Sequence, residues 1–213
     1  MTLFAMILNR IFLHLLFFGF AISTLGAAKP NVLFIVIDDL RPELGAYDTE
    51  AMLTPNIDRL AKKGIRFNNA FCQYPVCNPS RSSFLTGLRP DELGILENKT
   101  PLREKWPNIV TLPQLFRQNG YFTAGLGKLF HAGLDNQGKW TFFRDDASFD
   151  YFYTARGKTP EIGKKGIGRK LGDGTVGWCH WLAAEGGDEA QQDGMIAAEA
   201  ARVLEEHHDE PFF

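Results

Sequence analysis

Two neighbouring acidic residues and a short cysteine-containing stretch are the parts of this 213-residue sequence that suggest chemistry. Asp38 and Asp39 follow a run of apolar residues, and Cys77 opens the pentapeptide CNPSR. Adjacent carboxylates repel each other, so a site that keeps both ionised favours a nearby cation. Oxygen ligands of this kind suit Ca²⁺ or Mg²⁺. The alternative is a solvated turn in which one aspartate caps a backbone amide.

Cys77 lies where a helix is expected to begin, because Asn78 can cap a helix and Pro79 suits a first helical position. The amides at a helix N-terminus favour anions, and Arg81 follows four residues after the cysteine. The segment therefore predicts an anion site beside a reactive side chain. A buried thiol and a disulfide with Cys72 are the alternatives. A thiol-phosphatase loop is excluded, because it needs more than the three residues found here between cysteine and arginine.

A cation and an imidazole form the third candidate group. Lys128 and His131 follow the stretch YFTAGLG, which reads as a strand. Placed at the carboxyl end of a strand, a lysine and a titratable histidine would suit an anionic substrate. Two solvated loop residues are the alternative.

Strand and helix signals alternate around these residues. Apolar and β-branched runs predict strands at 31–37, 65–71 and 121–127. Caps, early prolines and terminal glycines predict helices at 54–64, 79–87 and 111–120. The stretch 188–206 is predicted to be an amphipathic helix, because Ile196, Ala200, Val203 and Leu204 fall on one face. This alternation predicts an α/β fold with a mostly parallel central sheet flanked by helices. Ligands of such sheets gather at the carboxyl ends of strands, where the candidate groups lie.

The composition indicates that the function depends on a local site and not on a large net charge. The formal net charge is −2, and 45% of the residues are hydrophobic, which is enough for a sizeable core. This balance offers no electrostatic footprint for nucleic acid, so we expect no nucleic-acid partner.

Residues 1–28 have the layout of a secretory signal peptide. Arg10 precedes a short apolar run, and small residues follow it up to Ala28. We expect cleavage there, a secreted or periplasmic protein and no stable membrane partner; an uncleaved anchor is the alternative. Cleavage would leave Cys72, Cys77 and Cys179, an odd number, so at least one cysteine is unpaired or modified.

Taken together, these stretches resemble the sulfatase family from about residue 29 to residue 131. The pattern Cys-x-Pro-Ser-Arg followed by Leu-Thr-Gly is matched by Cys77, Pro79, Ser80, Arg81, Leu85, Thr86 and Gly87. The pattern Gly-Tyr-x-Thr followed by Gly-Lys is matched by Gly120, Tyr121, Thr123, Gly127 and Lys128. The stretches NVLFIVIDDLRPELGAY and TPNIDRLAKKGIRFNNAF also match. DDLRPELGAY and GKLFH, with His131 three residues after Lys128, are similar to the iduronate-2-sulfatase branch.

The resemblance implies a fold like that of alkaline phosphatase and the hydrolysis of sulfate esters, here expected on sulfated carbohydrate. Cys77 would be oxidised to Cα-formylglycine by the formylglycine-generating enzyme, which reads Cys-x-Pro-x-Arg in the unfolded chain. One hydroxyl of the hydrated aldehyde would attack sulfur and release the alcohol. The second hydroxyl would then expel sulfate and restore the aldehyde.

The resemblance also implies the roles of the site residues. One Ca²⁺ would be held by Asp38, Asp39 and residue 77. Arg81 would hold the deprotonated diol, and Lys128 and His131 would steady the nucleophile and the sulfate oxygens.

Residues 29–213 are expected to be the N-terminal part of a sulfatase catalytic domain. The family takes further metal and sulfate ligands from later segments that have no match in this sequence. We therefore expect this chain alone to bind Ca²⁺ weakly and to hydrolyse nothing. A phosphodiesterase or phosphonate monoester hydrolase of the same superfamily and a non-catalytic secreted binding protein are the alternatives.

Overall fold

The computed structural model describes residues 28–134, 140–142, 144–155, 158–170 and 180–213. The chain divides into two units, Met1–Asn31 and Val32–Phe213. In the first unit only residues 28–31 are described, and they form neither helix nor strand. The predicted signal peptide lies outside the described residues except for its last position. Among the described helices, none combines the length and the apolar character needed to cross a membrane.

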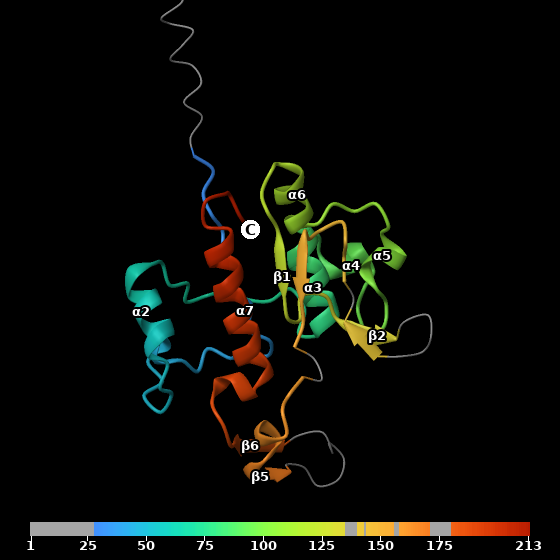
Figure 1. The fold of residues 1–213 in the computed structure, drawn as a ribbon. Helices are drawn as coiled ribbons and strands as arrows, with labels where there is room; N and C mark the ends of the chain where they lie inside the picture. Colours follow the sequence, from blue (N-terminus) through green and yellow to red (C-terminus); the bar gives the residue numbers. More distant parts are fainter. Residues whose placement is uncertain (1–27, 135–139, 143, 156–157, 171–179) are drawn as a thin grey trace, which may run out of the picture. The chain divides into compact units, whose positions relative to one another are not determined.

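The second unit contains helices that are mostly short (Figure 1). The α-helices are α2 Pro55–Lys63, α3 Cys77–Thr86, α4 Pro90–Leu93, α5 Leu102–Lys105, α6 Leu112–Gln118 and α7 Gln192–Glu206. Three 3₁₀ turns are η1 Gly45–Tyr47, η2 Ile162–Lys164 and η3 Asp188–Ala190.

The strands of the described residues form three two-stranded sheets. They are β1 Ala124–Leu126 with β4 Tyr151–Tyr153, β2 Ala132–Leu134 with β3 Trp140–Phe142, and β5 Gly166–Lys170 with β6 His180–Ala184. The first pair is parallel, with Gly125 opposite Phe152, and the other two pairs are antiparallel. Just before β1, Phe122 forms a parallel bridge with Phe212, whose carbonyl also accepts a hydrogen bond from the Val32 amide at 2.9 Å.

All four helix predictions are confirmed, with ends shifted by up to four residues. At α6 the Thr111 hydroxyl and the Gln114 side chain form the reciprocal bonds of a capping box. At the end of α3, Gly87 adopts φ +73°, a left-handed conformation that suits glycine. The helix predicted at 188–206 begins at Gln192, after the 3₁₀ turn η3. Helix α3 begins at Cys77 and its N-cap is Val76, so the prediction of an Asn78 cap is wrong.

Two strand predictions are wrong, and the third strand is shorter than expected. In the described part of the chain, neither 31–37 nor 65–71 forms a strand. The first stretch has no regular secondary structure, and residues 33–37, which we call the opening run, leave their side chains exposed. In the second stretch a side chain occupies a backbone acceptor, because the Tyr47 hydroxyl donates to the Phe67 carbonyl at 2.8 Å. The strand predicted at 121–127 is reduced to β1.

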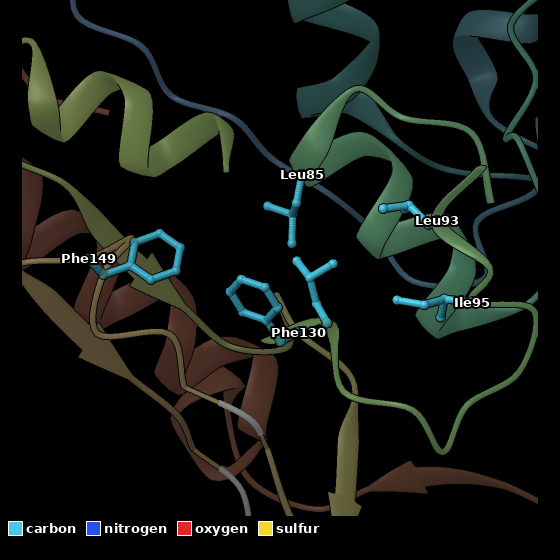
Figure 2. Packing of buried hydrophobic residues seen from close by; sticks show 6 residues of the cluster. Leu85, Leu93, Ile95, Phe130 and Phe149 are labelled. Carbon is cyan, nitrogen blue, oxygen red and sulfur yellow. The ribbon is translucent and has the colours of Figure 1, made fainter. Parts of the chain in front are cut away.

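Around helix α3 lies a hydrophobic cluster, which we call the α3 core. Its members are Leu85, Leu93, Ile95, Leu102, Phe130 and Phe149. Figure 2 shows that these side chains come from separate segments of the chain, among them α3, α4 and the stretches that follow β1 and precede β4. The core therefore anchors helix α3, and with it Cys77, to the segment that carries Lys128.

Candidate active site

The two aspartates lie in a turn that follows the opening run. Residues 38 and 39 form a turn, and Asp39 adopts φ +54°, which is uncommon for a residue other than glycine. Side chains alternate between faces in a strand, so this turn is what allows both carboxylates to approach one point. The turn therefore brings the predicted pair together at the position that the sequence indicated.

Asp38 joins two positive side chains from distant parts of the sequence. Its Oδ1 accepts a hydrogen bond from Arg81 at 2.6 Å, and its Oδ2 accepts one from Lys128 Nζ at 2.5 Å. Burial alone would raise the pKa of Asp38, but the hydrogen bonds and charges of these two partners outweigh it and hold that pKa below its usual value. Asp38 is therefore a carboxylate at neutral pH.

Cys77 is the first residue of helix α3, which confirms its predicted place beside a helix N-terminus. The Lys128 ammonium lies 3.6 Å from its Sγ. Cys77 is half-buried and has a free thiol, as has the exposed Cys72, so the two do not form a disulfide. The third cysteine, Cys179, lies outside the described residues. Helix amides and an ammonium group together favour a negatively charged atom on residue 77.

Arg81 lies on the same helix and is buried. Besides Asp38, its guanidinium donates to the Lys128 carbonyl and, at 3.4 Å, to the Leu129 carbonyl. Its Nε is buried without a hydrogen-bond partner among the described residues. Arg81 thus fixes the segment after β1 against helix α3, and its Nε remains without a partner among the described residues.

His131 follows that segment, and its Nδ1 is likewise buried without a partner in the described part of the chain. Burial lowers the pKa of His131. The charges of Lys128 and Arg81 lower it further, against the opposing charge of Asp38. A neutral imidazole with a free ring nitrogen can accept or donate a proton toward a bound substrate.

Three potential ligand atoms meet in this site. One atom each of Asp38, Asp39 and Cys77 lies within 4.8 Å of the others. Two carboxylates are suitable ligands for a hard cation, and an oxygen in place of the Cys77 sulfur would add a third. Such a shell is partial, because Ca²⁺ takes six to eight oxygen ligands. The residues present therefore fit one side of a Ca²⁺ site.

Sequence reasoning missed one group that holds Cys77 in place. Asn98 accepts a hydrogen bond from the Asn78 amide at 3.0 Å across 20 residues of sequence. The Asn78 side chain makes no capping bond to its own helix, and its Nδ2 donates to the carbonyls of Glu97 and Thr100. A single contact between distant residues leaves no periodic pattern, so no signal in the sequence indicated it.

The family model of the sulfatases matches residues 30–213. The chain belongs to the sulfatase family. Human iduronate 2-sulfatase is 46% identical to this sulfatase over 118 residues, which are 53% of this chain and 22% of that protein. A sulfatase of Formosa agariphila is 46% identical over 110 residues, which are 48% of this chain and 22% of that protein. This sulfatase chain spans about a fifth of the length of these relatives.

Two solved structures show the same fold class. One is a protein in complex with its substrate D-glucosamine-2-N,6-O-disulfate, with a TM-score of 0.58 and 26% identity. It covers 86% of this chain, and the match takes up 33% of its own length. The other is the phosphonate monoester hydrolase of Agrobacterium radiobacter, with a TM-score of 0.67, 22% identity and coverage of 87% of this chain and 40% of that one. These likenesses confirm the predicted α/β, alkaline-phosphatase-like fold.

Proposed function

We propose that this sulfatase hydrolyses sulfate esters of carbohydrates and that residue 77, converted from cysteine to Cα-formylglycine, is its nucleophile. One observation carries the proposal: Cys77 lies among two carboxylates, at 4.8 Å or less, and an ammonium group, at 3.6 Å. A plain thiol nucleophile has no use for paired carboxylates. A hydrated aldehyde at the same position has oxygens that can face both a cation and the Lys128 ammonium.

Some side chains around residue 77 would bind the nucleophile, and others would bind the sulfate. In the present structure the sulfur of Cys77 stands for an oxygen of the hydrated aldehyde. Lys128, whose ammonium lies beside residue 77, and the Nε of Arg81, which has no other partner in the described residues, would stabilise negative charge on that oxygen and on the sulfate. The Nδ1 of His131 is free to exchange a proton with the leaving alcohol or the diol.

Asp38 and Asp39, with an oxygen of residue 77, would hold one side of a Ca²⁺ ion. When bound, that ion supplies Lewis-acid stabilisation of the negative charge on sulfate. Asp38 already shares its two oxygens between Arg81 and Lys128, so its carboxylate is kept ionised and ready for a cation.

Carbohydrate is proposed as the substrate class because of the names and the bound substrate of similar proteins. One solved neighbour binds a disulfated glucosamine, and iduronate 2-sulfatase is 46% identical over the matched region. We further propose that the formylglycine-generating enzyme modifies the chain and that residues 1–28 direct it out of the cytoplasm. Residues 29–213 are proposed as the N-terminal part of the catalytic domain.

Mass spectrometry and activity assays on the full-length protein test the function. The protein is expressed with the formylglycine-generating enzyme, and the peptide that contains residue 77 is expected to carry an aldehyde in place of the thiol. Sulfated sugars should be hydrolysed, Cys77→Ala should abolish the activity, and Cys72→Ala should leave it unchanged. An unmodified thiol would favour a binding protein, and faster turnover of phosphodiesters or phosphonate esters than of sulfate esters would contradict the proposed reaction.

A further inference from the structure

Helix α3 has no capping side chain of its own. Its N-cap is Val76, which has no polar side-chain atom and makes no capping bond. The first helical bond runs from the Ser80 amide to the Val76 carbonyl at 3.1 Å, so the amides before Ser80 need partners from outside the helix. Pro79 has no amide hydrogen. The Asn78 amide is therefore the donor nearest the helix body that must find a partner elsewhere.

Asn98 provides that partner from a later segment. Its Oδ1 accepts from the Asn78 amide at 3.0 Å. The contact is reinforced in the opposite direction, because the Asn78 Nδ2 donates to the Glu97 carbonyl at 3.0 Å and to the Thr100 carbonyl at 2.8 Å. Asn78 is only 5% exposed, so water competes poorly for these bonds.

The partner segment is itself well ordered, and we call residues 97–100 the capping turn. The Glu97 carboxylate accepts hydrogen bonds from the Thr100 hydroxyl at 2.5 Å, the Lys99 amide at 2.6 Å and the Thr100 amide at 2.9 Å. Two residues before the turn, Ile95 is fully buried in the α3 core. The capping turn is thus fixed both by its own hydrogen bonds and by the core that holds helix α3.

We propose that Asn98 is a positioning residue for the proposed sulfatase reaction. Through the Asn78 amide it caps helix α3 and fixes the backbone of the adjacent residue 77, so that its side chain faces Asp38 and Lys128. Without this bond the first turn of the helix would open more often, because helix ends fray when their amides lack partners. The nucleophile would then spend less time in the orientation that the reaction needs.

Hydrogen exchange of the Asn78 amide in the full-length protein tests the cap directly. Asn98→Leu has a similar size but no acceptor, and it should speed the exchange about fivefold, which is the factor expected for the loss of a helix cap. Asn98→Asp keeps an acceptor and should retain the wild-type rate. Lys99→Ala is the matched control, because the exposed Lys99 side chain lies in the same turn and contributes its charge near Glu97, whereas the hydrogen bond of Lys99 to Glu97 comes from its backbone amide and is kept in the variant.

Kinetics of the same variants test positioning. Rates are referred to the fraction of chains in which residue 77 is converted, measured by mass spectrometry. Asn98→Leu should lower kcat about tenfold and change KM less than about twofold, because it misplaces the nucleophile without removing a substrate contact. Lys99→Ala should leave both constants unchanged.

The outcomes are distinguishable. Wild-type exchange at Asn78 in Asn98→Leu would overturn the cap. Faster exchange with an unchanged kcat would overturn the positioning role. A wild-type protein that hydrolyses no sulfate ester would overturn the proposed function and with it the link to catalysis, and the exchange measurement would still decide whether Asn98 caps helix α3.

Discussion

The α3 core and the opening run are both rich in large apolar side chains, but their surroundings differ. Leu93 in the α3 core is 0% exposed, whereas Leu33 in the opening run is 58% exposed. The core residues come from several segments that cover one another (Figure 2). In the opening run the Phe34 ring packs edge-on against Phe84, with centroids 5.7 Å apart, but Phe34 is still 48% exposed. Burial thus depends on how many segments converge on a stretch, not on its own hydrophobicity.

The candidate active site lies where these two regions meet. Cys77 and Arg81 belong to the helix that the core holds, whereas Asp38 and Asp39 follow the exposed run. Ion pairs from Asp38 to Arg81, at 2.6 Å, and to Lys128, at 2.5 Å, tie the aspartate turn to the buried region. One half of the site is therefore fixed by packing and the other half by charge.

Leu93→Ala tests the buried side of this comparison and should have the largest effect. Removing a fully buried leucine side chain loses its burial and leaves a cavity. The free energy of unfolding should fall by about 3 kcal/mol, measured by denaturant unfolding of this chain. A loss below about 1 kcal/mol would mean that the α3 core is loosely packed and that the contrast with the opening run is false.

Arg81→Ala tests the ionic connection between the two regions. The change removes one of the two positive partners of Asp38 and the donor to the Lys128 carbonyl, and it should destabilise the chain by about 2 kcal/mol. This value lies below that for a fully buried pair because the Asp38 side chain is 37% exposed. Arg41→Ala breaks the exposed pair with Glu43 and should change stability by less than about 0.5 kcal/mol. Equal effects in the two unfolding experiments would contradict a special role for Arg81.

Asp150→Asn tests whether an ionised carboxylate next to the α3 core residue Phe149 contributes to stability. Burial alone would raise the pKa of Asp150, but hydrogen bonds from Thr123 and Arg117 outweigh it and lower that pKa in the folded state. The resulting stabilisation is present above the unfolded value, near 3.8, and is lost as the pH falls through the folded pKa. Asp150 is exposed, so solvent screens its partners, and the variant should be only about 0.5 kcal/mol less stable than wild type at pH 7; the gap should close in acid. Thermal unfolding at both pH values would show a constant gap if the carboxylate charge were irrelevant.

Leu33→Ala should have the smallest effect and completes the comparison with Leu93→Ala. The same atoms are removed, but the Leu33 side chain is already largely exposed in this chain. Its free energy of unfolding should change by less than about 0.5 kcal/mol. A loss as large as that of Leu93→Ala, in the same denaturant series, would show that the opening run is buried in solution.

The elements with local signals could be predicted from the sequence. Thr111 with Gln114 marks the start of α6, and Gly87 marks the end of α3, because caps act within a few residues of the helix that they end. Strands were predicted less well, because of the three predicted stretches only 121–127 contains a strand, β1. A strand needs a hydrogen-bonded neighbouring strand. The apolar run at 31–37 has residue types that favour a strand, but the sequence does not reveal which segment would pair with it.

The sequence by itself determined the helices with local caps, the family motifs and the identity of the side chains in the candidate site. Only the tertiary structure decided which apolar stretch is buried, that Asp38 bridges Arg81 and Lys128, and that Asn98 caps the helix of Cys77. The physical reason is the range of the interactions. Caps join residues three or four positions apart, whereas the Asn78–Asn98 and Asp38–Lys128 contacts span 20 and 90 residues and exist only after the chain has folded.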